Sequence, residues 1–188
     1  TGVSNMVAEL ASKRLAVMKD AVPRARRIAL MFNPDDPVTV PQLREVERAG
    51  PALKIETRSF PVKAIEALPE TFKQMVAWRA DAAVWLLGQQ QAFQTRSSEL
   101  AANHRLPLMV GNPRNVVAGG LISYTFDSVE VFRRTAAVVD RIFKGAKPGD
   151  LPVEQPTKFE LTINLKSAKA LGLTIPQSLR VQADHVIE

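Results

Sequence analysis

An apolar run that breaks at once into a polar, proline-punctuated loop is the feature that most constrains this chain. Residues 28–32 (IALMF) form the run, and residues 33–37 (NPDDP) follow it directly. A short apolar run bounded by turn residues is typical of a central parallel strand, because helices cover both of its faces. Open α/β sheets bind their ligands at the carboxyl ends of such strands. The loop is therefore expected to form one wall of a small-molecule cleft, with Asn33 and Asp36 as candidate binding residues.

The rest of the chain repeats this alternation of strands with helices of ten or so residues. Buried strands are predicted at 81–87 and 106–110, a further strand at 121–124, and a more exposed, alternating strand at 54–62. Helical spacing of apolar residues and capping residues predict helices at 3–21, 39–50, 69–79 and 92–104. This order predicts βαβ units, and hence an α/β fold with a Rossmann-like parallel sheet and helices on both faces.

The last third of the chain departs from this pattern. Residues 127–144 predict a strongly amphipathic helix, and residues 147–156, with three prolines and no periodicity, predict a linker. A strand at 157–165, a short helix at 166–171 and a final short strand within 181–187 are expected to follow. The apolar stripe of the long helix consists of Val129, Phe132, Ala136, Val139 and Phe143.

Four polar loop tips are expected to meet at one edge of the sheet, because each follows a predicted strand. They are residues 33–36, 88–91, 111–115 and 124–127, where amides and backbone N–H groups can bind a polar or zwitterionic ligand. Such residues also favour ordinary turns, so a purely structural role is the alternative for each one taken singly. The candidate ligand-binding residues are Asn33, Asp36, Gln89, Gln90, Gly111, Asn112, Tyr124 and Phe126, the last two as an apolar or stacking surface.

Catalytic and cofactor motifs are absent from the sequence. It has no nucleophile elbow, Walker loop, dinucleotide fingerprint or zinc-protease motif, no cysteine, and only two isolated histidines, His104 and His185. The net charge of +6 is scattered in short clusters without interleaved aromatic residues, so no nucleic-acid partner is expected. We therefore expect neither an enzyme nor a bound cofactor or metal.

Several segments resemble the substrate-binding proteins of ABC-type importers, and specifically the family that includes the tryptophan-binding TrpX-like proteins. The most distinctive is the ending KGAKPGDLPVEQPTKFELTINLKSAKALGLTIPQSL at 144–179, followed by ADHVIE. The segments TGVSN at 1–5, VPRARRIALMFNP at 22–34, HRLPLMVG at 104–111 and GGLISY at 119–124 agree with it. The resemblance spans essentially the whole chain and implies a type 1 periplasmic binding protein fold, in which two α/β lobes hold a ligand between them.

The resemblance also implies a division of the chain. Residues 1–118 would form the C-terminal lobe, 119–148 would cross to an N-terminal lobe that is missing here, and 149–188 would return to complete the C-terminal lobe. Family members are longer, which implies a signal peptide lost with the missing region and a periplasmic or extracytoplasmic location. Because the apolar stripe would face the missing lobe, we expect the helix to pack on a second copy, in a symmetric or domain-swapped homodimer.

The implied function is capture of a small molecule between the lobes and its delivery to an ABC permease. TrpX-like members point to an amino acid, especially an aromatic one. Asn33 and Pro34 match the NP that follows the first strand of the family, and Gly111 and residues 119–124 match as well. The loop GQQQ at 88–91 departs from the more apolar, proline-containing loop of the family, which leaves the ligand open. The alternatives are the effector-binding core of a LacI-like transcription regulator, which shares the fold, and, ranked last, an α/β enzyme.

Overall fold

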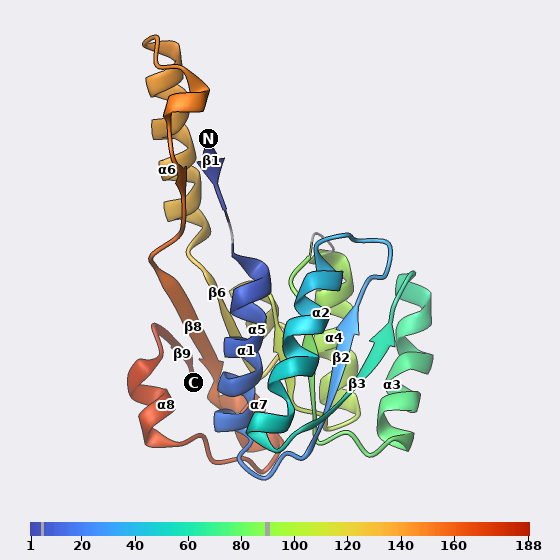
Figure 1. The fold of residues 1–188 in the computed structure, drawn as a ribbon. Helices are drawn as coiled ribbons and strands as arrows, with labels where there is room; N and C mark the ends of the chain where they lie inside the picture. The colour runs from blue at the N-terminus through green and yellow to red at the C-terminus, as the bar shows by residue number, and fades with distance from the viewer. Residues whose placement is uncertain (5, 89–90) are drawn as a thin grey trace.

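Seven strands form one mixed sheet in the part of the chain that this computed structural model describes, residues 1–4, 6–88 and 91–188 (Figure 1). All neighbouring strands run parallel except β6 and β8, which are antiparallel. The predicted α/β fold with a largely parallel sheet is confirmed. In spatial order the strands are β3 (Glu56–Pro61), β2 (Arg27–Phe32), β4 (Ala82–Trp85), β5 (Leu108–Val110), β6 (Ile122–Phe126), β8 (Phe159–Asn164) and β9 (His185–Ile187).

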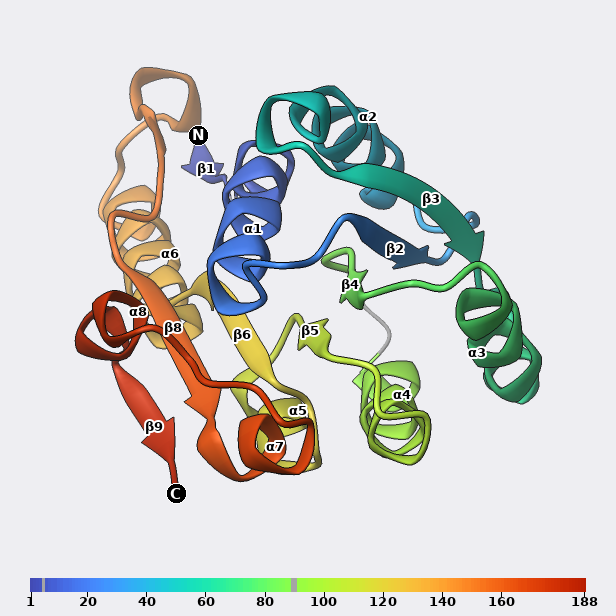
Figure 2. The ribbon, with the colours of Figure 1, turned by 90° about the horizontal axis from the view of Figure 1, so that it is seen from below.

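Helices cover both faces of this sheet (Figure 2). Helices α1 (Val7–Ala21) and α2 (Thr39–Ala49) lie on one face, and α3 (Leu68–Ala77) and α4 (Gln91–Asn103) lie on the other. Strand β2 contributes to both cores, because Ile28 and Leu30 pack on the α1 side while Ala29 and Met31 pack on the α3 side. This double burial is what the continuous apolar run predicts for a central strand.

Several short elements were not anticipated from the sequence. Helix α5 (Pro113–Val117) lies where a plain loop was expected, because Asn112 accepts a hydrogen bond from the Arg114 amide and caps it. Helix α8 (Gln177–Gln182) precedes β9. Helix α7 (Leu165–Ala170) is close to the short helix that was predicted. Single-turn 3-10 helices occupy η1 (Pro51–Leu53), η2 (Ile65–Ala67) and η3 (Pro148–Asp150).

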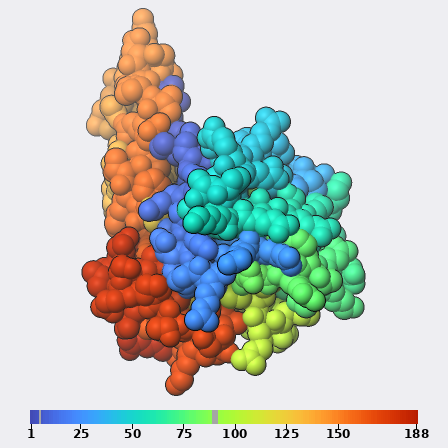
Figure 3. Space-filling model, turned by 60° about the horizontal axis from the view of Figure 1, so that its bottom comes forward, coloured from blue at the N-terminus to red at the C-terminus, as the bar shows by residue number. Residues whose placement is uncertain are grey.

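Helix α6 (Ser128–Phe143) projects from the sheet and forms an arm with a two-stranded ribbon (Figures 1 and 3). The ribbon pairs β1 (Gly2–Val3) with β7 (Val153–Glu154), so two segments expected to belong to a helix and a linker form strands instead. Glu154 ties the arm together, because Arg141 and Arg134 of α6 lie 2.8 and 3.7 Å from its carboxylate. None of the described helices is both long enough and apolar enough to span a bilayer.

The apolar stripe of α6 faces solvent in this chain. Its large side chains, Val129, Phe132, Val139 and Phe143, are 63%, 74%, 41% and 85% exposed, while Val131 and Val138, which lie outside the stripe, are buried. Strand β6 belongs to the same predicted crossover segment, yet it hydrogen-bonds between β5 and β8 in the main sheet. The division of the chain into lobe and crossover segments stays a prediction.

Candidate ligand-binding site at the carboxyl edge of the sheet

The carboxyl ends of β2, β4 and β5 lie side by side, so the loops that follow them share one edge of the sheet. A small hollow opens there, about 10 Å³ in volume. Such a volume admits about one water molecule, so this surface alone does not enclose a ligand. Its lining consists of Asn33, Asp36, Thr39, Trp85, Leu86, Gly88 and Gln94.

The loop after β2 is folded by its own side chains. The Asn33 side-chain oxygen accepts a hydrogen bond from the Asp35 amide at 3.0 Å, and Asp36 Oδ1 accepts one from the Val38 amide at 3.0 Å. Thr39 Oγ1 lies 2.9 Å from the Asn33 carbonyl oxygen and 2.8 Å from that of Asp36. These local bonds are the turn chemistry that Asn, Asp and Thr favour, and they fix the position of both predicted binding residues.

Gly88 lets the loops after β2 and β4 approach each other closely. A Cβ atom added to Gly88 would lie 2.6 Å from Asp36 Oδ2, which is closer than two such atoms can come. The Asp36 carboxylate therefore packs directly on the backbone that follows β4. The two glutamines predicted next in this loop, Gln89 and Gln90, lie outside the described residues.

A fully buried arginine holds the ends of β4 and β5. Arg14 of α1 donates from Nη1 to the Trp85 carbonyl at 2.7 Å and from Nη2 to the Val110 carbonyl at 2.9 Å. It forms no ion pair within the described residues, and its Nε has no hydrogen-bond partner there. Burial alone lowers the pKa of Arg14 from its ordinary value to about 9. One cationic side chain thus sets the spacing of two strand ends directly beneath the candidate site.

Two buried amides hold the loops themselves. The Gln42 side chain of α2 donates to the Leu87 carbonyl at 2.6 Å and accepts from the Leu87 amide at 2.8 Å. The Gln94 side chain of α4 accepts from the Gly111 amide at 2.6 Å and lies 3.4 Å from the Asn115 side-chain nitrogen. The edge is therefore fixed by buried polar side chains from three helices, and backbone groups held in this way keep their geometry before a ligand arrives.

Arg14, Gln42 and Gln94 were not among the residues predicted from the sequence, although a signal for Arg14 was present. It follows Ala11 and precedes Met18 at helical spacing, so a charged residue lies on the apolar stripe of α1. A charged or amide side chain at such a position is buried with specific partners or not at all. Their partners are backbone groups of distant strands, which no local pattern reveals.

The remaining predicted residues divide into two groups. Gly111 lies at the described edge beside Gln94, and Asn112 follows it but uses its side-chain oxygen to cap α5. Tyr124 and Phe126 lie within β6 rather than in the loop where they were expected, because β6 pairs with β8 as far as Phe126. The Tyr124 ring stacks on Phe159, with ring centres 6.0 Å apart. Burial, and then the negative charge of Asp184, raise the pKa of Tyr124.

Titratable clusters that could hold a metal do not occur among the described residues, in which no three His, Asp or Glu side chains come together. The polar groups at the carboxyl edge are side-chain amides, backbone N–H groups and the Asp36 carboxylate, and the N–H groups of Asp35 and Gly111 already donate to the Asn33 and Gln94 side chains. This set can hold a polar small molecule by hydrogen bonds and, through Asp36, by charge.

Solved structures with the same fold extend beyond this chain. A Streptococcus pneumoniae ABC domain in complex with L-Trp is 24% identical with a TM-score of 0.84, and the match covers 94% of this chain and 62% of that one. A conserved domain protein of Vibrio cholerae is 20% identical with a TM-score of 0.85, over 94% and 60% of the two chains. A LacI family regulator of Bifidobacterium animalis is 14% identical with a TM-score of 0.65, over 80% and 59%. This chain thus spans about 60% of the length of each.

Sequence comparison gives the family directly. No curated protein matches the chain. The family model for ABC transporter substrate binding proteins matches residues 1–187, nearly the whole sequence. The match agrees with the resemblance drawn from the ending of the chain and with the α/β fold. The chain belongs to the ABC transporter substrate-binding protein family.

Proposed function

We propose that this protein is the solute-binding component of an ABC importer, which captures a small molecule and delivers it to a permease without transforming it. The observation that carries the proposal is the preorganised carboxyl edge, where Arg14, Gln42 and Gln94 fix three adjacent loop starts. An edge with fixed donors and acceptors is suited to recognition, because little ordering remains to be done when the ligand binds. Membership of the substrate-binding family supports the same role.

The site is half of a complete one. Small-molecule pockets enclose about 300–1,000 Å³, whereas the hollow at this edge holds about 10 Å³. The chain also spans only about 60% of the length of the matching structures. A second lobe would supply the facing wall, and a ligand that contacts both lobes would stabilise the closed arrangement over the open one. We therefore expect this chain alone to bind its ligand weakly.

An amino acid is the ligand class that we propose. The Asp36 carboxylate at the edge suits an ammonium group, while the side-chain nitrogen of Asn112, whose oxygen caps α5, suits a carboxylate. The matching Streptococcus pneumoniae structure holds L-Trp, which supports an aromatic side chain here. Tyr124 and Phe126 remain candidates for contacts with that side chain.

Binding measured by saturation-transfer NMR tests the ligand class, because it detects millimolar affinities. We expect amino acids from a panel of twenty, the aromatic ones foremost, to give a signal with the 188-residue chain and to lose most of it in Asp36→Asn. Asp140→Asn on α6 makes the same change of charge away from the edge and serves as the control. Micromolar binding by this chain would show that one lobe holds the complete site, and silence across the panel would end the amino-acid proposal.

We propose that the arm of the 188-residue chain packs on a second copy of the chain. In a longer protein, the same arm would pack on the missing lobe. Four large apolar side chains of α6 are exposed along one stripe, and each would gain roughly 1.5–3 kcal/mol on full burial. A homodimer, symmetric or domain-swapped, would cover them. Size-exclusion chromatography with light scattering at micromolar concentration should give a dimer that Phe132→Asp dissociates. A monomer under these conditions would contradict the dimer proposal.

We propose the cellular location and the class of protein from the family match. A substrate-binding protein that meets a permease works outside the cytoplasm, so we propose a periplasmic or extracytoplasmic location. An effector-binding core of a LacI-like regulator remains the second candidate, because such regulators share this fold. The two differ upstream of the first residue: a signal peptide in the gene favours the importer, and a helix-turn-helix segment favours the regulator.

A further inference from the structure

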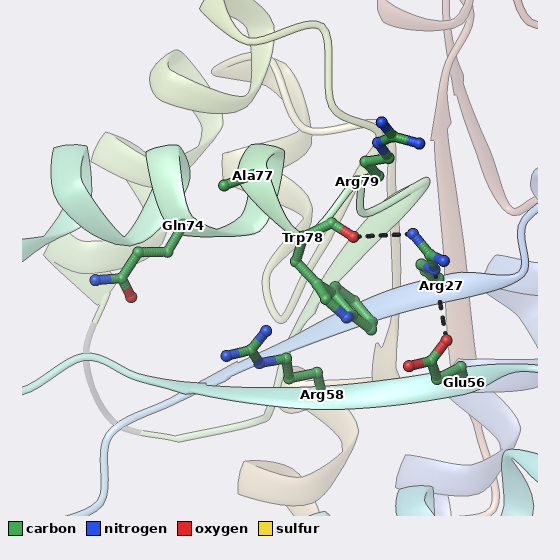
Figure 4. A pocket seen from close by; sticks show the side chains of 7 residues that line it. All are labelled: Arg27, Glu56, Arg58, Gln74, Ala77, Trp78 and Arg79. Carbon is green, nitrogen blue, oxygen red and sulfur yellow. Dashed lines mark hydrogen bonds and ion pairs between the residues drawn. The ribbon is translucent and has the colours of Figure 1, made fainter.

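A hollow of about 530 Å³ lies at the opposite edge of the sheet from the candidate site (Figure 4). Arg27 and Glu56 begin β2 and β3, and Trp78 and Arg79 follow the end of α3, so the hollow lies at the amino ends of the parallel strands. Its volume falls within the range of about 300–1,000 Å³ that is usual for small-molecule sites. It is an open depression on the surface, so a ligand held there would remain partly exposed to solvent.

The charge of this hollow is strongly positive. Three guanidinium groups, those of Arg27, Arg58 and Arg79, line it against one carboxylate, that of Glu56. Arg27 is already engaged, because its Nη1 donates to the Trp78 carbonyl at 3.2 Å and its Nε lies 3.4 Å from Glu56. In the described part of the chain, the guanidinium groups of Arg58 and Arg79 make no hydrogen bond or ion pair, so their N–H donors are open to a ligand.

One aromatic residue of the core, Phe60, lies against the side chains of both Arg58 and Trp78. The guanidinium carbon of Arg58 lies 5.5 Å from the ring centre of Phe60, and the Trp78 ring lies 5.9 Å from the same ring. Phe60 itself is buried. Figure 4 places the Trp78 indole between Arg58 on one side and the pair Arg27 and Glu56 on the other. The half-buried indole and a guanidinium are thus held next to each other at the mouth of the hollow.

A second hollow strengthens the positive potential on the other side of Arg27. Arg26 lines it together with Lys19, Arg24 and Lys54, and none of its lining side chains is acidic. The nearby Asp81 carboxylate is engaged by the backbone amides of Arg26 and Arg27, at 2.7 and 2.9 Å. Clustered charges of one sign raise the local concentration of the opposite ion, so an anion is attracted to this edge of the sheet.

We propose that the hollow lined by Arg27, Arg58, Trp78 and Arg79 is a second binding site, for a small molecule that carries an oxyanion beside a planar ring. Guanidinium groups bind phosphate or carboxylate oxygens through paired N–H donors, and an indole stacks on a planar ring. A nucleoside monophosphate is the simplest molecule with both parts. The site lies away from the carboxyl edge, and it does not depend on the proposed capture of a solute there.

The competing explanation is that Arg58 protects an exposed edge strand. Strand β3 is the outermost strand of the sheet, and charged side chains on such strands discourage pairing with another chain. That role needs a charge anywhere along β3, whereas binding needs Arg58 beside Trp78. The two explanations therefore predict different results of a titration with a nucleoside monophosphate. A binding site gives saturable binding that depends on Arg58, whereas protection of the edge strand does not.

Tryptophan fluorescence provides the titration. Trp78 lines the hollow, whereas Trp85, the other tryptophan, is buried in the core. The probes are adenosine 5′-monophosphate, adenosine and inorganic phosphate, each added to the 188-residue chain at low salt. We expect saturable binding of the monophosphate that is tighter than binding of either part. Binding of adenosine as tight as that of the monophosphate would overturn the oxyanion assignment, and no saturable change below 10 mM would overturn the site.

Matched variants distinguish specific binding in this hollow from a general effect of positive charge. Arg58→Gln is expected to weaken monophosphate binding roughly five- to tenfold, the cost of losing a charge-assisted pair of hydrogen bonds near the surface. Arg79→Gln should weaken it less, because Figure 4 shows Arg79 beyond Arg27 and directed away from the indole. Arg44→Gln, an exposed position on α2, removes the same charge away from the hollow. Equal effects of Arg58→Gln and Arg44→Gln would contradict a specific site.

Trp78→Phe tests the stacking part by a readout that needs no tryptophan. Equilibrium dialysis with labelled monophosphate should show weaker binding to this variant, while binding of inorganic phosphate stays the same. An unchanged monophosphate affinity would show that the indole does not contact the ring. Circular dichroism melts of each variant confirm that the chain is folded under the conditions of the titration.

Discussion

The Nη1 atom of Arg14 lies 2.7 Å from the carbonyl oxygen of Trp85, the last residue of β4, and this contact is buried. The other terminal nitrogen of the same group reaches the carbonyl of Val110, the last residue of β5. One helix therefore fixes the two strand ends from which the loops of the candidate site begin. The charge has no acidic neighbour within the described residues, so the carbonyl oxygens are what keeps it in place.

Replacing Arg14 by Met should destabilise the fold by about 2 kcal/mol. Met fills much of the same space but leaves two buried carbonyl oxygens without donors, each costing roughly 1–3 kcal/mol, and the removal of a desolvated charge offsets part of this cost. Arg14→Lys keeps the charge and some of the donors, so we expect a smaller loss. Urea denaturation measures both variants. A Met variant as stable as the parent would show that this contact does not hold the strand ends.

The pH dependence of the same group has a definite sign. Burial lowers the pKa of Arg14 from its ordinary value to about 9, so from about pH 9 up to the pH at which the unfolded group also loses its proton, the unfolded chain binds more protons than the folded one. In this window stability from Arg14 rises with pH, and below pH 9 the full cost of burying the charge is present. The difference in unfolding free energy between the parent and Arg14→Met should therefore shift in favour of the parent from pH 8 to pH 10.5. A constant difference would contradict a depressed pKa.

Gln42→Leu should loosen the loop after β4. The amide of Gln42 satisfies both backbone groups of Leu87, and Leu would leave both unpaired in a buried site, at a cost of about 2 kcal/mol or more. Hydrogen exchange of the Leu87 amide should speed up well beyond the global change in stability. Gln74→Leu on the exposed side of α3 makes the same substitution without such partners, and it should change the unfolding free energy by less than about 0.5 kcal/mol.

Two glycine-to-alanine changes should have opposite consequences. At Gly88 the new methyl group meets the far end of the Asp36 side chain, which can turn away, so stability changes little while Asp36 leaves its place at the edge. At Gly120 the methyl group meets the Asn115 backbone oxygen at 3.0 Å and the Val110 side chain, which cannot move as freely, and a loss of about 1–3 kcal/mol is expected. Thermal melts compare the stability of the two variants, and amino-acid binding shows whether Asp36 has left its place in the Gly88 variant. Equal stability of the two variants would contradict this difference in surroundings.

The local sequence pattern was enough to predict the sheet, because its strands have a recognisable pattern of apolar residues. The run 28–32 is apolar at every position, and both of its faces are buried in the structure. The loops after β2, β4 and β5 were also predicted to share one edge, since parallel strands share their direction. Tyr124 and Phe126 were misplaced, because the antiparallel partner β8 comes from more than thirty residues further along and extends β6 past the predicted end.

The side chains that hold the loops of the candidate site could not be predicted from the local sequence pattern, for a different reason. Arg14, Gln42 and Gln94 reach backbone atoms 17 to 96 residues away, and such partners are set by packing alone. The amphipathic pattern of α6, by contrast, correctly identified an apolar stripe but not its surroundings. Its large side chains are exposed in this chain, and periodicity alone does not record what covers a stripe.

The most direct test of the central claim is an NMR titration of backbone amides with L-tryptophan, using the ¹⁵N-labelled 188-residue chain. If the carboxyl edge is half of a solute site, the amides of Asn33, Gly88 and Gly111 should shift together in a single weak, saturable process. Shifts confined to other surfaces, such as the amino edge near Arg27 and Trp78, would contradict the assignment of solute capture to this edge.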